Sequence, residues 1–156
     1  MSNHYTLSLV LYFKEKLEPN DQATLKYLFL QAETAPNAWP EHQFFRDIPS
    51  PLRLGYESFS SGDFLCELWC HEDGSLAGIN LRVPSLADHT FFDYLLLADW
   101  LAKLSLPAGF VGTGTNEYRS SETMLLYVVD STLYITNFQP KQLKGFVSGD
   151  PIEISE

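Results

Sequence analysis

The chain has 156 residues, of which 45% are hydrophobic, so it is long enough to bury a core and is not disordered in composition. Ten basic and twenty acidic residues give a formal net charge of −10. Phosphate groups are bound by clustered basic side chains, and the sequence contains no such cluster, which argues against nucleic acid and anionic membranes as partners. An acidic surface favours basic proteins or cationic ligands instead.

The sequence predicts a cytoplasmic protein. No apolar run reaches the roughly 18 residues that a membrane-spanning helix needs, and the N-terminus lacks the basic region and cleavage site of a signal peptide. Cys66 and Cys70 lie on one predicted strand, roughly 13 Å apart, which is too far for a disulfide. Both are expected to point into the core as small hydrophobic residues.

Residues 6–14 alternate between apolar and other side chains, which predicts a strand, and a helix follows after Pro19 with Asn20 as its cap. The apolar residues of this helix form one stripe, as expected for a helix laid on a sheet. They are Leu25, Leu28, Phe29 and Ala32.

The stretch from residue 35 to residue 51 contains four prolines and is predicted to be a long loop, and residues 52–60 are predicted to form the next strand. The loop carries Trp39, His42, Phe44 and Phe45. These aromatic side chains either pin the loop to the core or form a lid or contact surface.

Residues 63–83 contain two alternating runs around Asp73-Gly74, which predicts a β-hairpin with a two-residue turn. The turn sets a register in which every pair on one face is apolar. The pairs are Cys70 with Ala77, Leu68 with Ile79, Cys66 with Leu81, and Phe64 with Val83. The opposite face is mixed, with Trp69 expected to lie over Gly78, and it also carries Glu67, His71 and Arg82.

Ser85 and Asp88 resemble a capping box and predict a second, more buried helix that ends before Pro107. Residues 110–119 then form a strand weakened by Gly112 and Gly114. This strand is a candidate sheet edge, and because edges invite pairing between subunits, a homodimer is plausible.

A second hairpin is predicted over residues 122–137, with its turn at Asp130-Ser131. Its expected pairs are Val128 with Leu133 and Leu126 with Ile135 on the core side, and Tyr127 with Tyr134 on the other side. Residues 1–137 are therefore expected to form a single α+β domain. Residues 138–156 are a polar tail with room for one short edge strand.

The two predicted helices share a pattern: Asp21, Tyr27, Leu28 and Leu30 align with Asp88, Tyr94, Leu95 and Leu97. The element order is strand–helix–strand–strand, given twice, with a closing strand. This order resembles the tandem proteins of the GyrI-like kind. The resemblance implies a mostly antiparallel sheet with two helices on one face, and a concave sheet face that holds an apolar or cationic ligand. The same order fits a ferredoxin-like variant with extra strands.

No catalytic motif is present. The four histidines form no His-x-x-x-His pair and the cysteines no Cys-x-x-Cys pair, so no metal site is predicted. Gly112-Thr-Gly-Thr lacks the third glycine and the following helix of a phosphate-binding loop. Cys70 and His71 are neighbours on a strand and point to opposite faces, so they cannot act as nucleophile and base. We expect no enzyme and no cofactor.

The sequence therefore predicts a non-enzymatic binding protein that docks a basic protein partner, like an inhibitor or immunity protein of bacterial type. The alternative is a sensor that holds a small apolar or cationic molecule on the sheet face. The candidate binding residues have the aromatic and charged character of contact hot spots. They are Glu67, Trp69, His71, Arg82, Tyr127, Tyr134 and Trp39.

Overall fold

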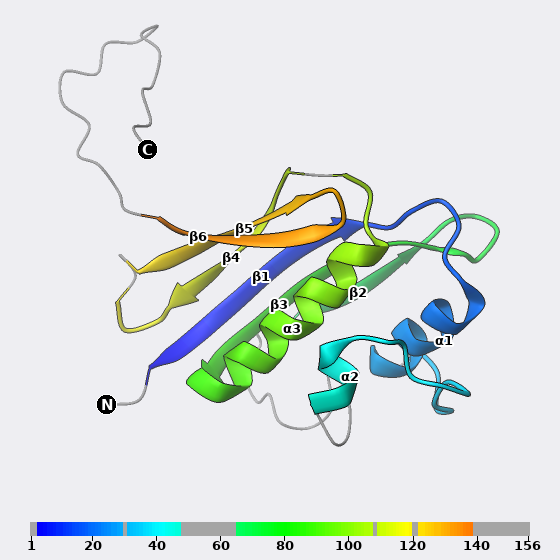
Figure 1. The fold of residues 1–156 in the computed structure, drawn as a ribbon, viewed down its shortest axis with the longest axis horizontal. Helices are drawn as coiled ribbons and strands as arrows, with labels where there is room; N and C mark the ends of the chain where they lie inside the picture. The colour runs from blue at the N-terminus through cyan, green and yellow to red at the C-terminus, as the bar shows by residue number, and fades with distance from the viewer. Residues whose placement is uncertain (1–2, 30, 48–64, 108, 120–121, 139–156) are drawn as a thin grey trace, which may run out of the picture.

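The computed structural model describes residues 3–29, 31–47, 65–107, 109–119 and 122–138. These residues form a six-stranded antiparallel sheet with three helices on one face (Figure 1). The α+β class and the antiparallel sheet expected from the sequence are thus confirmed. None of the helices in this part of the chain is long and apolar enough to cross a membrane.

The strands follow the order β2-β3-β1-β4-β5-β6 across the sheet. Their bounds are β1 His4–Tyr12, β2 Leu65–Cys70, β3 Leu76–Ala87, β4 Gly109–Asn116, β5 Thr123–Val129 and β6 Thr132–Phe138. The helices are α1 Pro19–Leu28, α2 Gln43–Asp47 and α3 Asp88–Leu104.

The topology of the described strands matches the ferredoxin-like alternative. Strands β3 and β4 flank β1 and are joined through α3, while β1 and β2 flank β3 and are joined through the segment that contains α1 and α2. These two interleaved crossovers form the split arrangement of ferredoxin-like folds, and the β5–β6 hairpin extends the sheet beyond β4. The strand predicted at residues 52–60, which the tandem arrangement needs, lies outside the described residues.

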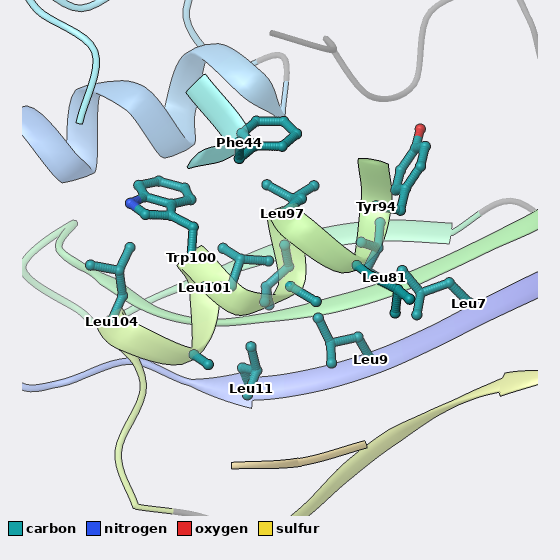
Figure 2. Packing of buried hydrophobic residues seen from close by; sticks show 14 of the residues in the cluster. Leu7, Leu9, Leu11, Phe44, Leu81, Tyr94, Leu97, Trp100, Leu101 and Leu104 are labelled. Atoms are coloured by element: carbon teal, nitrogen blue, oxygen red, sulfur yellow. The ribbon is translucent and has the colours of Figure 1, made fainter. Parts of the chain in front are cut away.

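The core lies between the sheet and the helices. Figure 2 shows Leu9 and Leu11 of β1 beneath Leu101 of α3, with Phe44 of α2 on the other side of α3. Phe44 is fully buried, as are the three leucines. Helix α3 is therefore apolar over more than one stripe because it is covered by the sheet below and by α2 above.

The register of the β2–β3 hairpin is confirmed at its centre, where Leu68 pairs with Ile79. The turn differs from the prediction, since His71 and Ser75 close a three-residue loop in which Gly74 has a φ of 85°. Cys70 pairs with Leu76 and Trp69 pairs with Gly78, so Ala77 has no partner on β2. Ala77 is therefore the extra residue of a β-bulge in β3. The predicted pair of Cys70 and Ala77 is therefore wrong.

The position of Cys70 also differs from the prediction. Cys70 is exposed at the end of an edge strand, whereas Cys66 is half-buried and packs against the core, so the expectation of two inward thiols is wrong for Cys70. Phe64, the expected partner of Val83, lies outside the described residues.

Both helix starts differ from the predictions. Helix α1 begins at Pro19 with Glu18 in the cap position, and the amide of Asn20 donates to the carbonyl of Ala38 instead of capping the helix. Ser85 cannot cap α3, because its backbone has a φ of 59° and its N–H donates to the carboxylate of Glu117. The stripe of α1 is confirmed at Leu25, Leu28 and Phe29, which are buried.

Two further predictions need correction. The loop expected at residues 35–51 contains the short helix α2. Strand β4 is not a sheet edge, since Gly112 pairs with both Leu9 and Leu126. A Cβ at Gly112 would collide with the backbone of Ser8, so glycine allows this close approach between β1 and β4. The edges of the described sheet are β2 and β6.

Candidate functional site: the open face of the sheet

The helices leave one face of the sheet uncovered by the part of the chain that the structure describes. On β1, for example, Leu9 and Leu11 are buried beneath α3, while Val10 and Tyr12 alternate with them and are exposed. We call this surface the open face. Its members are Ser8, Val10, Tyr12, Leu65, Glu67, Trp69, Gly78, Asn80, Arg82, Phe110, Thr113, Thr115, Leu125, Tyr127, Tyr134 and Thr136.

Five aromatic side chains of the open face lie at the same end of their strands. The register pairs Trp69 with Gly78 and Gly78 with Tyr12, and on the other half of the sheet it pairs Phe110 with Tyr127 and Tyr127 with Tyr134. Tyr12 is the last residue of β1 and Phe110 is the second residue of the neighbouring antiparallel strand β4, so the two sets lie at the same end of adjacent strands. We call these five residues the aromatic row.

Ring contacts hold the two halves of the row in place. The rings of Tyr12 and Trp69 are 5.6 Å apart at an interplanar angle of 35°, and those of Phe110 and Tyr127 are 5.7 Å apart and edge-to-face. The row is nevertheless accessible, since Tyr12 is 59% exposed, Phe110 57% and Tyr134 54%.

Gly78 makes the Trp69 half of the row possible. A Cβ at this position would lie 2.9 Å from Cε3 of Trp69 and 2.6 Å from the carbonyl oxygen of Leu11. Because glycine has no side chain, the indole lies across β3 and reaches Tyr12 on β1. The expectation that Trp69 lies over Gly78 is confirmed.

Charged groups are sparse on the open face and gather at the turns beside the aromatic row. The face carries Glu67 and Arg82, and the turns at the same end of the sheet carry Glu72, Asp73 and Asp130, all exposed. The side chain and the backbone N–H of Ser75 both donate to the Asp73 carboxylate and lower its pKa below the ordinary value, so this residue stays negatively charged.

The structure brings together most of the residues predicted from the sequence. Glu67, Trp69, Arg82, Tyr127 and Tyr134 all lie on the open face. His71 belongs to the β2–β3 turn, where its N–H donates to the carbonyl of Ser75, and it is exposed beside the row.

Trp39 lies apart from these residues, in the helix layer. Its ring stacks on Phe45 at 5.6 Å and contacts Tyr27, and Phe45 in turn packs edge-to-face on Trp100 of α3. Trp39 is therefore not a member of the open face. Its segment is pinned to the helices, which is one of the two alternatives expected for the loop.

Sequence reasoning missed Tyr12 and Phe110. Tyr12 follows from the alternation of β1, in which its neighbours Leu11 and Phe13 are buried, so the signal was present in the pattern. Phe110 has no such signal, because a bulge between Phe110 and Gly112 sets which face it occupies. Tyr12 and Phe110 lie on adjacent strands because of the order of strands in the sheet, and local sequence patterns do not determine this order.

A histidine–carboxylate pair lies in the helix layer, but both ring nitrogens of the histidine are occupied. Nε2 of His42 lies 2.7 Å from Oδ2 of Asp99, and Nδ1 accepts the N–H of Phe44 at 3.1 Å. His42 is buried at the start of α2. The pair therefore joins α2 to α3 and has no free nitrogen to act as a base. Among the described residues, no group of three or more potential ligands could hold a metal.

Two of the hollows lined by described residues lie beside α1. One, of about 460 Å³, is formed where the β1–α1 connection meets the β2–β3 turn, and the other, of about 330 Å³, lies along α1. Neither is lined by a member of the aromatic row. Comparison of the chain with protein-family models, curated proteins and solved structures finds no match.

Proposed function

We propose that the protein is a non-enzymatic binding protein that docks a protein partner on the open face, with the aromatic row at the centre of the contact. The row itself is the observation that carries the proposal. Contiguous exposed apolar surface is rare on soluble monomers and marks interaction sites, and Trp and Tyr are the residues most enriched in binding hot spots.

The shape and chemistry of the surface support a protein partner. The row crosses β1, β2, β4, β5 and β6, so it presents a broad surface made of large rings. The centre of a protein interface is depleted in charge and has a polar rim. The open face has this composition, with threonine and serine beside the rings and Glu67 and Arg82 towards one edge.

The charge of the chain supports a basic partner. The net charge is −10, and Glu72, Asp73 and Asp130 lie in the two hairpin turns at the same end of the sheet as the aromatic row. Acidic groups around an apolar centre attract a basic protein over a distance and orient it before contact. This pattern is typical of an inhibitor or immunity protein that covers a basic target, and we take the protein to act in the cytoplasm of a bacterium.

The sensor alternative has less support. A small molecule is bound in a concave pocket that buries most of its surface. Two hollows lined by described residues, of about 460 Å³ and 330 Å³, contain neither Trp69 nor Glu67, which were the expected ligand-binding residues.

Partner capture by structure-guided variants tests the proposal. Tyr12→Ala and Phe110→Ala remove large exposed rings, so folding should survive while the affinity for a captured partner falls. A hot-spot loss of about 2 kcal/mol corresponds to a roughly 30-fold higher Kd. The partner is first isolated with the wild-type protein, and its affinity for each variant is then measured by calorimetry.

Phe92→Ala is the matched control. Phe92 is also a large apolar residue, 65% exposed, but it lies on α3 in the helix layer. The Phe92→Ala substitution should therefore leave the affinity for the partner unchanged. Equal losses in Phe92→Ala and Tyr12→Ala, or no loss in the two open-face variants, would refute the open face as the docking surface.

A further inference from the structure

Strand β6 is an edge of the described sheet and lacks three features that protect edges, namely charges, prolines and bulges. Exposed edges carry unpaired N–H and C=O groups, and proteins block them with charges, prolines or bulges. The other edge, β2, has Glu67 and a bulge beside Trp69. Strand β6, with the sequence TLYITNF, has no charge and no proline, and it pairs with β5 without a bulge.

The hairpin turn determines which backbone groups of β6 point outward. Val129 and Thr132 flank the two-residue turn, and such a closing pair exchanges both of its hydrogen bonds. Hydrogen-bonded pairs then recur at every second residue, so Thr132, Tyr134 and Thr136 bond to β5. The N–H and C=O groups of the intervening residues, Leu133, Ile135 and Asn137, point away from the sheet.

Both faces of this strand carry exposed apolar side chains. Tyr134 is 54% exposed on the open face, and Ile135 is 44% exposed on the helix face. An uncharged strand of this composition, with no proline, pairs readily with another strand. The described part of the chain places no strand on its outer side.

We propose that β6 pairs with β6 of a second copy of this chain, antiparallel and about a two-fold axis at Ile135. Ile135 is the middle residue of Thr132–Phe138. Around this centre Ile135 faces its own copy, and Leu133 faces Asn137 of the other chain, so every outward group of the three residues gains a partner. The pairing joins two six-stranded sheets into one.

The electrostatics of β6 favour a second copy in spite of the charge of the whole chain. Two molecules of net charge −10 repel each other, so a self-contact must avoid acidic residues. Strand β6 contains none. This inference does not depend on the proposed function, because the aromatic row stays on the open face of the joined sheet.

Analytical ultracentrifugation of the full chain and its variants tests the proposal. The wild type should show a concentration-dependent monomer–dimer equilibrium. Ile135→Pro removes an outward N–H and no bond to β5, so it should fold and remain a monomer. Leu65→Lys, on the opposite edge, should form dimers like the wild type. A wild type that is monomeric up to about 1 mM, or Ile135→Pro dimers of unchanged affinity, would overturn the proposal.

Cysteine cross-linking tests the register. In a Cys70→Ser background, Ile135→Cys places two thiols across the two-fold axis with Cα atoms roughly 5.5 Å apart, within disulfide range. Thr132→Cys is the control, because its two copies would be about 20 Å apart. Mild oxidation should give a covalent dimer with Ile135→Cys alone. Equal cross-linking at both positions, or at neither, would contradict this arrangement.

Discussion

His42 connects the start of α2 to α3, a contact that the sequence pattern does not predict. Its side chain accepts the N–H of Phe44, its carbonyl accepts the N–H of Phe45, and its Nε2 bonds to Asp99 of α3. Replacing His42 with alanine keeps the bond of its backbone carbonyl and removes the two bonds of its ring, which leaves the N–H of Phe44 and the carboxylate of Asp99 without these partners.

We expect His42→Ala to lower the free energy of unfolding by roughly 2 kcal/mol. His89→Ala serves as the control, since His89 is exposed at the start of α3 and should change stability little. Urea denaturation followed by circular dichroism measures both variants. Equal stability of His42→Ala and the wild type would show that the Asp99 pair contributes nothing.

The half-buried thiol of Cys66 predicts a loss of stability in alkali. Burial, with a smaller contribution from Glu67, raises the pKa of Cys66 from an ordinary value of 9.0 to about 12. Between these values the unfolded chain binds fewer protons than the folded one, so stability falls as the pH rises through this window. Burial also raises the pKa of Tyr94, which acts in the same direction.

Cys66→Ala isolates the contribution of the thiol. Its free energy of unfolding should fall less steeply from pH 9 to pH 12 than that of the wild type. Chemical denaturation at several pH values measures the slope. Identical slopes for the two proteins would show that Cys66 is not desolvated in the fold.

At the scale of single elements, the β5–β6 turn imposes a backbone conformation that its residues do not favour. Asp130 and Ser131 have φ values of 49° and 62°, which is the geometry of a type I′ turn. Asparagine and glycine adopt this conformation best, and serine carries a penalty in it.

Ser131→Gly should therefore stabilise the protein by about 0.5–1 kcal/mol and raise its Tm. Thr132→Gly, one residue further on in β6, should destabilise it by a similar amount, because glycine in a strand loses packing and gains freedom in the unfolded chain. Thermal unfolding distinguishes the two, and a lower Tm for Ser131→Gly would contradict the type I′ assignment.

Local patterns predicted the elements whose partners are near in sequence. The β5–β6 register, with Tyr127 opposite Tyr134, follows from alternation and the two-residue turn. The β2–β3 hairpin shows the limit of this reasoning. Its centre is as predicted, but the three-residue loop and the bulge at Ala77 depend on a partner outside the hairpin. The Ala77 carbonyl accepts the N–H of Phe13, which lies far away in the sequence.

The candidate site was predictable only in part for the same reason. Glu67, Trp69 and Arg82 share a face because one hairpin contains them, and Tyr127 and Tyr134 share a face because another does. The aromatic row appears only when β1 and β4 lie between these hairpins. The place of Trp39 stayed open at the level of the sequence, because an aromatic residue in a loop carries no information about the layer in which it packs.

At the scale of the whole molecule, charge and apolar surface should make separable contributions to binding. The rings of the aromatic row are uncharged, whereas Glu72 and Asp130 lie in the hairpin turns at the same end of the sheet. Attraction between exposed charges is screened as the ionic strength rises, but apolar burial is not. The affinity for a basic partner should therefore fall as salt is added and then level off. The remaining affinity should come from burial of the aromatic rings.

A double substitution separates the two contributions. Glu72→Gln with Asp130→Asn removes two charges, and asparagine is suited to the positive φ at residue 130. This variant should bind more weakly than the wild type at low salt and equally well at high salt, mainly through slower association. Tyr12→Ala should bind more weakly at every salt concentration. Surface plasmon resonance measures both, and a salt-independent loss in the charge variant would mean that these carboxylates contact the partner directly and do not act by attraction over a distance.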